Sequence, residues 1–162
     1  GHIRSGDYVA VLAGARQNRT RATDQPDSFA SLSESVRDVV RRPAPEAITI
    51  AGLAADHYPP AGEPDGPPLV IVHGAMDRAA GFRRTARHLP YRDIVAYDRR
   101  GYAGSRDVPP VREFATQVDD LVAVLTELIA ANGERRLVVG HSAGGLIALH
   151  ALARPGIEES RS

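Results

Sequence analysis

The 162-residue chain contains neither cysteine nor lysine, and each absence excludes several kinds of chemistry. Without cysteine there is no thiol nucleophile, no thiolate metal site and no disulfide framework. Without lysine there is no P-loop lysine, no Schiff base and no Ser–Lys dyad, because each of these needs the lysine amine. All 20 basic residues are therefore arginines, and 20 acidic residues balance them.

The sequence also lacks net charge and long hydrophobic runs. A formal charge of zero, with a pI near 7.2, provides no bulk field to hold nucleic acid or an anionic membrane. No apolar run approaches the roughly 18 residues of a membrane span, and the N-terminus lacks the layout of a secretory signal. No H-x-H or H-E-x-x-H spacing suggests a histidine metal site. We therefore expect no nucleic-acid partner, no membrane span, no metal, no cofactor and a cytoplasmic location.

The length and the hydrophobic content of 43% suit one domain with a real core. Residues 1–45 combine a short apolar patch at 8–13, a polar stretch, and a helical pattern from 29 to 42. We interpret residues 1–45 as an N-terminal extension that is flexible in part. Residues 46–162 then form the main domain.

Strand and helix patterns alternate through this domain. Four strands are expected, the first two as a hairpin and the third buried on both faces because it is uninterrupted and apolar. They are followed by a fifth strand that leads into a glycine-flanked serine. The strands are predicted at 48–50, 53–58, 69–72, 94–97 and 137–140.

Three helices are predicted after the last three strands. The first has Asp77 as its N-cap and places Phe82, Ala86 and Leu89 on one face. The second runs from Phe114 along one apolar stripe and ends at Asn132-Gly133, a typical C-cap. The third follows Gly145. This alternation predicts an α/β fold, a doubly wound and mostly parallel sheet with helices on both faces.

Three glycine-rich loops follow strands of this sheet, at 73–74, 98–105 and 140–145. In such sheets, chemistry occurs at the carboxyl ends of the strands, so we expect the three loops to meet at one site. The last loop has the pattern G-x-S-x-G around Ser142, in which Gly140 and Gly144 leave room for a sharp turn. Such a turn exposes the serine hydroxyl and places the Ala143 N–H at a helix N-terminus, where it can stabilise negative charge. Ser142 is the candidate nucleophile.

Together, the three motifs resemble the α/β-hydrolase family over roughly residues 46–155, and the serine makes the chain similar to its serine esterases and lipases. The resemblance implies a nucleophile at Ser142 and an oxyanion hole formed by the backbone N–H groups of Ala143 and Ala75, with Met76 as the alternative to Ala75. It further implies that His73, Gly74, Asp98, Gly140 and Gly144 shape the loops rather than react.

The family places its catalytic acid and histidine after the serine. Twenty residues follow Ser142 here, and they contain no aspartate. His150 lies on the same predicted helix, about 12 Å along its axis, which is beyond the reach of a general base. We therefore expect this to be the N-terminal portion of the hydrolase domain, truncated before the acid, the histidine and the C-terminal strands. Alone, it should be nearly inactive.

Several functions remain open. The first is a serine hydrolase that cleaves an ester-like bond of a small acyl substrate through an acyl-enzyme on Ser142. Acyltransferase, thioesterase and C–C hydrolase activities of the same fold are alternatives. A different alternative is a non-catalytic or split hydrolase half, whose open fifth strand and apolar helix face associate with a complementary chain.

Overall fold

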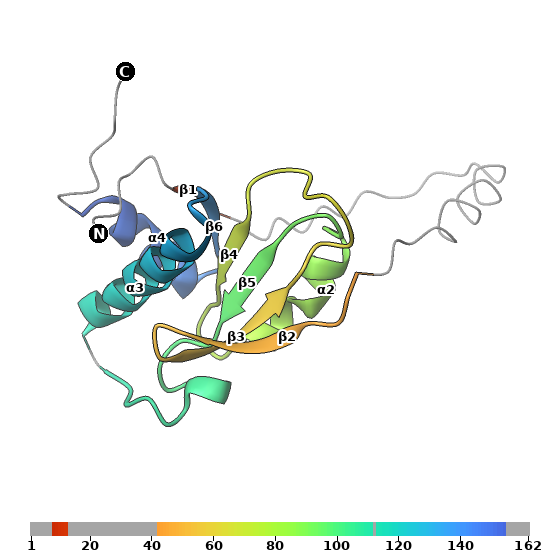
Figure 1. Cartoon of the computed structure of the whole chain (residues 1–162). Helices are drawn as coiled ribbons and strands as arrows, with labels where there is room; N and C mark the ends of the chain where they lie inside the picture. Colours follow the sequence, from red (N-terminus) through yellow and green to blue (C-terminus); the bar gives the residue numbers. More distant parts are fainter. Residues whose placement is uncertain (1–7, 13–41, 112, 155–162) are drawn as a thin grey trace, which may run out of the picture.

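The computed structural model describes the backbone of residues 8–12 and the residues 42–111 and 113–154 with their side chains. They form a sheet with helices on both faces (Figure 1). The strands are β1 (Tyr8–Leu12), β2 (Glu46–Ile50), β3 (Leu53–Tyr58), β4 (Leu69–Val72), β5 (Ile94–Tyr97) and β6 (Arg136–Gly140). The helices are α2 (Arg83–Arg87), α3 (Phe114–Asn132) and α4 (Ala143–Leu152), with 3-10 turns η2 (Ala79–Phe82) and η3 (Ala103–Ser105).

The strand order in the sheet is β1-β6-β4-β5-β3-β2. β1, β6, β4 and β5 pair in parallel, whereas β3 pairs antiparallel with both β5 and β2 and is the strand that runs against the others. The predicted α/β class and the mostly parallel sheet are therefore confirmed. Because β5 and β6 lie on opposite sides of β4, the chain reverses its winding direction there, and such a switch point is where α/β sheets bind ligands.

The first two predicted strands of the domain, β2 and β3, form a tight hairpin, as expected. Its last pair is Ile50 with Leu53, so Ala51 and Gly52 alone make the turn. Both turn residues have positive φ, 49° and 75°, the backbone of a type I′ turn. The Ala51 N–H also donates to Glu127 Oε2 at 2.7 Å, which ties the turn to α3.

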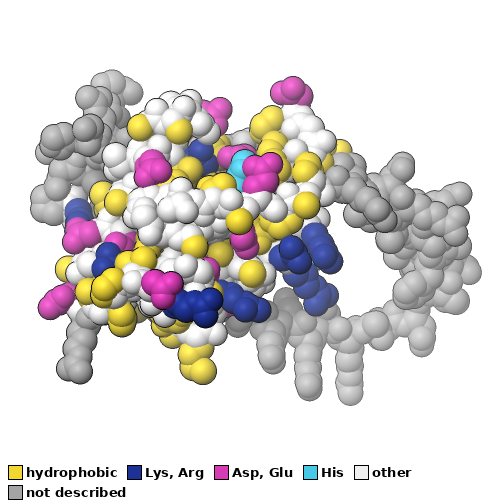
Figure 2. All heavy atoms as spheres, turned by 60° about the horizontal axis from the view of Figure 1, so that its bottom comes forward, with side chains coloured by type: hydrophobic (Ala, Val, Ile, Leu, Met, Phe, Trp, Pro, Cys, Tyr) yellow, Lys and Arg dark blue, Asp and Glu magenta, His cyan; other side chains and the backbone are white. Residues whose placement is uncertain are grey.

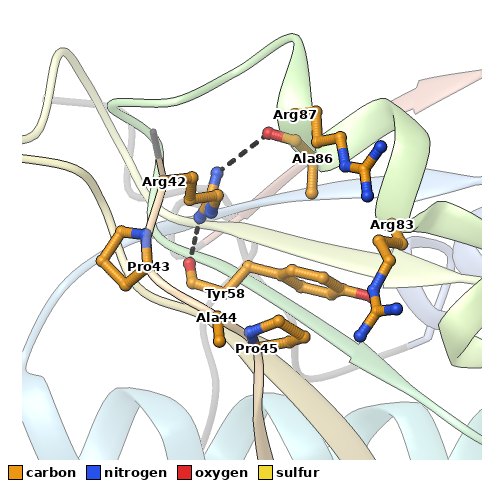
Figure 3. A pocket seen from close by; sticks show the side chains of 8 residues that line it. All are labelled: Arg42, Pro43, Ala44, Pro45, Tyr58, Arg83, Ala86 and Arg87. Carbon is orange, nitrogen blue, oxygen red and sulfur yellow. Dashed lines mark hydrogen bonds between the residues drawn. The ribbon is translucent and has the colours of Figure 1, made fainter. Parts of the chain in front are cut away.

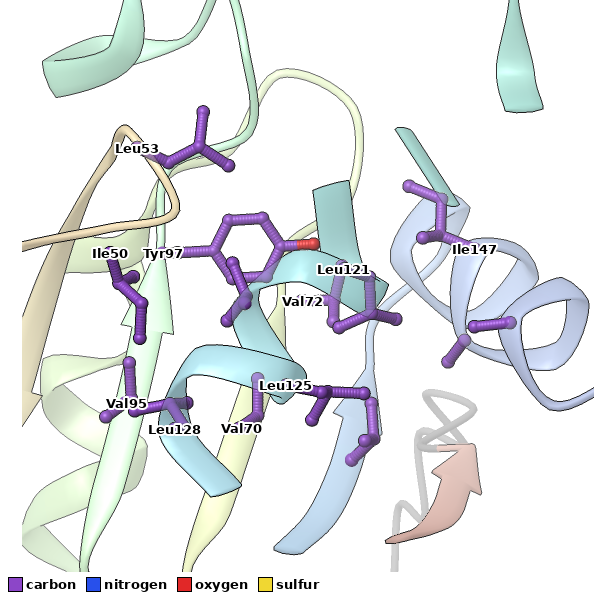
Figure 4. Packing of buried hydrophobic residues seen from close by; sticks show 14 of the residues in the cluster. Ile50, Leu53, Val70, Val72, Val95, Tyr97, Leu121, Leu125, Leu128 and Ile147 are labelled. Carbon is purple, nitrogen blue, oxygen red and sulfur yellow. The ribbon is translucent and has the colours of Figure 1, made fainter. Parts of the chain in front are cut away.

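The core lies on both faces of β4, whose four residues are all buried. Val70 and Val72 pack into the larger cluster, which α3 and α4 cover (Figure 4). Leu69 and Ile71 belong to a smaller cluster on the other face, beneath η2 and α2. This alternation confirms that the apolar run at 69–72 is a central strand and fixes the face on which each helix packs.

The apolar stripe of α3 is confirmed, and so is its C-cap. Val118, Leu121 and Leu125 are buried against the sheet. Gly133 has a φ of 70°, and its N–H donates to the Ile129 carbonyl at 2.7 Å. A left-handed residue of this kind satisfies a carbonyl that the end of the helix would otherwise leave unpaired.

Two details of the N-terminal half differ from prediction. Asp77 is not a helix N-cap: it accepts from the Arg78 N–H at 2.8 Å, and a 3-10 turn with Arg78 as its N-cap precedes α2. Residues 8–12, assigned to the extension, form β1 and pair along the whole of β6. The β6 edge, which we expected to be open, is therefore covered. The predicted helix at 29–42 and the flexible part of the extension fall largely outside the described residues.

None of the helices in the described ranges combines the length and the apolar character needed to cross a membrane. The same residues contain no group of three or more potential side-chain metal ligands.

A charged network ties together four segments at the amino ends of the parallel strands. His57 Nε2 lies 2.6 Å from Asp93 Oδ1, and His57 Nδ1 lies 3.5 Å from Glu46 Oε2. Asp93 also contacts the buried Arg136 at 3.4 Å. The hydrogen bond to Asp93 raises the pKa of His57 against the effect of burial. Burial alone would raise the pKa of Asp93, but His57 and Arg136 lower it overall.

Replacing His57 with Gln should therefore destabilise the fold more in acid than in base. Because the folded-state pKa of His57 is raised, its contribution is complete below the ordinary value of 6.5 and is lost as the pH rises through the folded value. The measurement is the free energy of unfolding of both proteins in urea at about pH 5.5 and about pH 8.5. His88→Gln, at the end of α2, is the matched control. If His57→Gln lowered the free energy of unfolding equally at both pH values, the proposed contribution of the charged network would be wrong.

Candidate active site

Ser142 lies with His141 in the turn between the end of β6 and the start of α4, in a backbone conformation that is unusual for serine. Its φ is 54° and its ψ is −120°, and its side chain is exposed. A non-glycine residue with positive φ is strained, and such strain persists where the surrounding structure enforces it. The predicted sharp turn at Ser142 is therefore present.

Close packing on both sides of the turn explains why its flanking residues are glycines. A Cβ on Gly140 would lie 2.5 Å from the Gly145 Cα, and one on Gly144 would lie 2.1 Å from the Val72 carbonyl oxygen. Real side chains do not approach backbone so closely. The atoms nearest to a side chain at Gly144 do not belong to β6, the strand that feeds the turn. Such a side chain would collide instead with β4, the neighbouring strand, because α4 begins directly above the end of β4.

The loop after β4 lies directly beside Ser142. A Cβ on Gly74 would be 3.0 Å from Ser142 Cβ and 3.1 Å from the His141 carbonyl oxygen. A side chain at this position would force its neighbours to shift by a few tenths of an ångström. The loops at 73–74 and 140–145 are therefore adjacent, as their positions in the sequence predicted.

The Gly74 carbonyl is held from two directions. His73 Nδ1 donates to it at 2.7 Å, and Arg99 Nη2 donates to it at 2.9 Å. The other ring nitrogen of His73 accepts from the Arg99 N–H at 3.0 Å, so both nitrogens are used and the ring is neutral. Burial lowers the pKa of His73, which agrees with this state. His73 thus joins the ends of β4 and β5.

Asp98 fixes the third loop. One carboxylate oxygen accepts from the Ala79 N–H at 2.7 Å, and the other accepts from the Gly104 N–H at 2.9 Å. The side chain is 8% exposed, so a carboxylate without these donors would be costly there. Asp98 therefore links the start of η2 to the loop at 98–105 and does not point its oxygens at an open site.

Arg99 is a site residue that the sequence analysis included in a loop but did not single out. It is 5% exposed and bonds Gly74, and it also donates to the Gln117 side chain of α3. Its guanidinium lies 4.7 Å from the centre of the Tyr102 ring. The sequence does not reveal that Arg99 binds the Gly74 carbonyl, because the two residues are 25 positions apart in the chain.

The histidines of the described part of the chain do not form a hydrogen bond with Ser142. His73 uses both ring nitrogens elsewhere, and His57 lies in the network at the opposite end of the sheet. His150 packs edge-on against Phe114, with ring centres 5.0 Å apart. His141 is exposed next to Ser142, and its ring lies edge-on to Phe82 with centres 6.4 Å apart.

Figure 2 turns the carboxyl ends of the strands toward the viewer. Acidic, basic and hydrophobic side chains are intermingled over this face. No field of a single sign covers it among the described residues, in keeping with a formal net charge of zero.

The model of the alpha/beta hydrolase family matches residues 69–158, and the chain belongs to this family. Lipase LipV of Mycobacterium tuberculosis is 37% identical over 95 residues, which cover 57% of this chain and 34% of that protein. The crystal structure of a membrane phospholipase A, a bacterial virulence factor, matches with a TM-score of 0.52 and 30% identity, covering 77% of this chain and 41% of that one.

An epoxide hydrolase from an endophytic Streptomyces is also similar, with a TM-score of 0.52 and 26% identity, covering 71% of this chain and 34% of that one. The chain spans 35% of the length of one curated relative, an AB hydrolase superfamily protein of Bacillus subtilis, and 34% of the length of LipV, about a third in each case. These relatives are hydrolases that cleave different bonds. Family membership therefore does not identify the bond that is cleaved, which has to be inferred from the site.

Replacing Gly144 with Val should damage both folding and activity. The Cβ would lie 2.1 Å from a backbone oxygen of β4, so α4 or β4 must move, at a cost of at least about 2 kcal/mol. The control is Gly62→Ala, whose Cβ would make an ordinary 3.7 Å contact with Tyr91 and should change stability by less than about 0.5 kcal/mol. Urea denaturation measures both. A Gly144→Val protein as stable as Gly62→Ala would refute the packing.

Proposed function

We propose that the full-length protein is a serine hydrolase that cleaves an ester-like bond of a small acyl substrate through an acyl-enzyme on Ser142. The observation that carries the proposal is the strained, exposed serine at the turn between β6 and α4. A hydroxyl in that place can attack a carbonyl while the N-terminus of α4 faces the oxygen that becomes negative.

The oxyanion would be bound by the N–H groups of Ala143 and Ala75. Ala143 opens α4, and no side-chain hydrogen bond caps that first turn. At the other loop, the Gly74 carbonyl and the Ala75 N–H belong to one planar trans peptide and point in opposite directions. Because His73 and Arg99 hold the carbonyl, they also fix the direction of the N–H.

This arrangement favours Ala75 over Met76 as the second donor. The Ala75 N–H is oriented before any substrate binds, and donors fixed in advance are what stabilise a developing oxyanion. Met76 has a left-handed φ of 60°, and its side chain is 98% exposed. Met76 stays the alternative donor, since the peptide that carries its N–H lies one residue further along the same loop.

The reaction needs a general base, because a serine hydroxyl is a weak nucleophile without one. We propose that this base is a histidine, oriented by an acidic residue, in a part of the full-length protein outside these 162 residues. Acyltransferase, thioesterase and C–C hydrolase activities stay open, since they share the nucleophile and the oxyanion hole and differ in the acceptor and the leaving group.

The second candidate, a non-catalytic or split half that associates with a complementary chain, is favoured by one observation. Leu146 and Leu149 of α4 are 55% and 42% exposed. Apolar side chains on one helix face are suited to a partner surface. The β6 edge no longer supports this reading, because β1 covers it.

A fluorophosphonate probe should label Ser142 of the full-length protein, because only an activated serine next to oxyanion donors reacts readily. Peptide mass spectrometry locates the modification. Ser142→Ala should abolish labelling, and Ser105, which is 1% exposed, serves as the unreactive serine within the same protein. Labelling that survives in Ser142→Ala would remove Ser142 as the nucleophile.

The purified 162-residue chain should hydrolyse an activated aryl ester only weakly. Loss of the base costs roughly a millionfold in turnover, while an oxyanion hole and binding retain about 10³ to 10⁴ over water. A rate typical of a working esterase would mean that His141, the exposed neighbour of Ser142, acts as base, and His141→Gln would test it. Recovery of activity on adding a second polypeptide with the remaining strands would favour the split enzyme.

A further inference from the structure

Figure 3 shows a pocket of about 250 Å³ near the amino end of β5, at the opposite end of the sheet from Ser142, which the close-up does not include. Tyr58, one of its lining residues, pairs with Ile94, where β5 begins. Ser142, in contrast, follows the carboxyl end of β6, which is parallel to β5. The pocket is therefore separate from the candidate active site.

Three of the eight residues that line this pocket are arginines, and none of the eight is acidic. Arg83 and Arg87 stand one helical turn apart on α2, and Arg42 comes from the segment that precedes β2 (Figure 3). Like charges at this helical spacing repel each other. Within the described residues, Arg83 and Arg87 form neither an ion pair nor a side-chain hydrogen bond that would offset the repulsion.

Arg42 is fixed in the wall of the pocket. Its guanidinium donates to the carbonyls of Ala86 at 3.1 Å and Leu89 at 2.6 Å, and also to those of Tyr58 and Arg92. These carbonyls accept from both Nη groups, leave the buried Nε without a partner among the described residues, and do not neutralise the charge. Burial lowers the pKa of Arg42, while the nearby Asp93 opposes that effect. The pocket thus combines one immobilised cation with two that can turn toward a ligand.

The remaining wall is apolar. Pro43 and Pro45 line one side of the pocket, and the ring of Tyr58 extends between them and the arginines of α2 (Figure 3). Tyr58 is 2% exposed, and burial, with Asp56 nearby, raises its pKa to about 12, so it stays neutral. A ligand for this pocket needs an anionic head for the arginines and an apolar body for the prolines.

We propose that this pocket binds a small phosphate ester with an aromatic or other apolar group. Arg83 and Arg87 would hold the phosphate, since a guanidinium binds phosphate oxygens in pairs and two of them balance a dianion. The apolar group would pack against Pro43 and Pro45. The proposal does not depend on the reaction at Ser142.

Calorimetric titration with phenyl phosphate at low ionic strength tests this site. Arg83→Gln/Arg87→Gln should weaken binding about tenfold or more, because each change removes charge-assisted hydrogen bonds. Arg84→Gln, an exposed arginine of the same helix outside the lining, should change affinity by less than about twofold. Ser142→Ala should bind as the unmodified protein does, which separates this site from the candidate active site.

Inorganic phosphate and phenol test the charged half and the apolar half of the site separately. Each should bind more weakly than phenyl phosphate, because each lacks one half of the contacts. The proposal fails if phenyl phosphate shows no saturable binding, if Arg84→Gln weakens binding as much as the double variant, or if inorganic phosphate binds equally well. Circular dichroism confirms that each variant is folded, and the single variants Arg83→Gln and Arg87→Gln replace the double one if it is not.

Discussion

The contact between Gly144 and the Val72 carbonyl is the constraint on which the site depends. A single Cβ at Gly144 would come within 2.1 Å of that oxygen, so α4 can begin above the end of β4 only because the side chain is missing. This approach brings Ser142 beside Gly74 of the next loop, where another Cβ would be 3.0 Å from Ser142. The strain at Ser142 is maintained by this packing, since the turn has no space to relax.

Buried polar groups then hold the loops around that contact. His73 and Arg99 bind the Gly74 carbonyl, and Asp98 binds two backbone N–H groups from η2 and the following loop. Each of these side chains is less than a tenth exposed, so its hydrogen bonds are expensive to break. The backbone beside Ser142 is therefore oriented before a substrate arrives, which is the condition for stabilising a developing charge.

Local patterns in the sequence predicted most of the fold. Gly140 and Gly144 flank Ser142 because the turn has no room for side chains at these positions. The apolar stripe of α3 is regular because one face of the helix is buried. What stayed hidden depends on partners distant in sequence. The pairing of β1 with β6, the bond from Arg99 to Gly74, and the pocket between α2 and the segment before β2 each join residues more than 20 positions apart, and no short pattern encodes such a meeting.

The central claim is that Ser142 and the N–H groups of Ala75 and Ala143 form one reactive unit. It is tested most directly by a crystal structure of the full-length protein after reaction with a phosphonate ester. The account predicts a covalent bond from Ser142 Oγ to phosphorus and a phosphonyl oxygen about 2.7 to 3.1 Å from the nitrogens of both alanines. A phosphonyl oxygen that points away from both nitrogens, or a phosphorus bound to another residue, would contradict it.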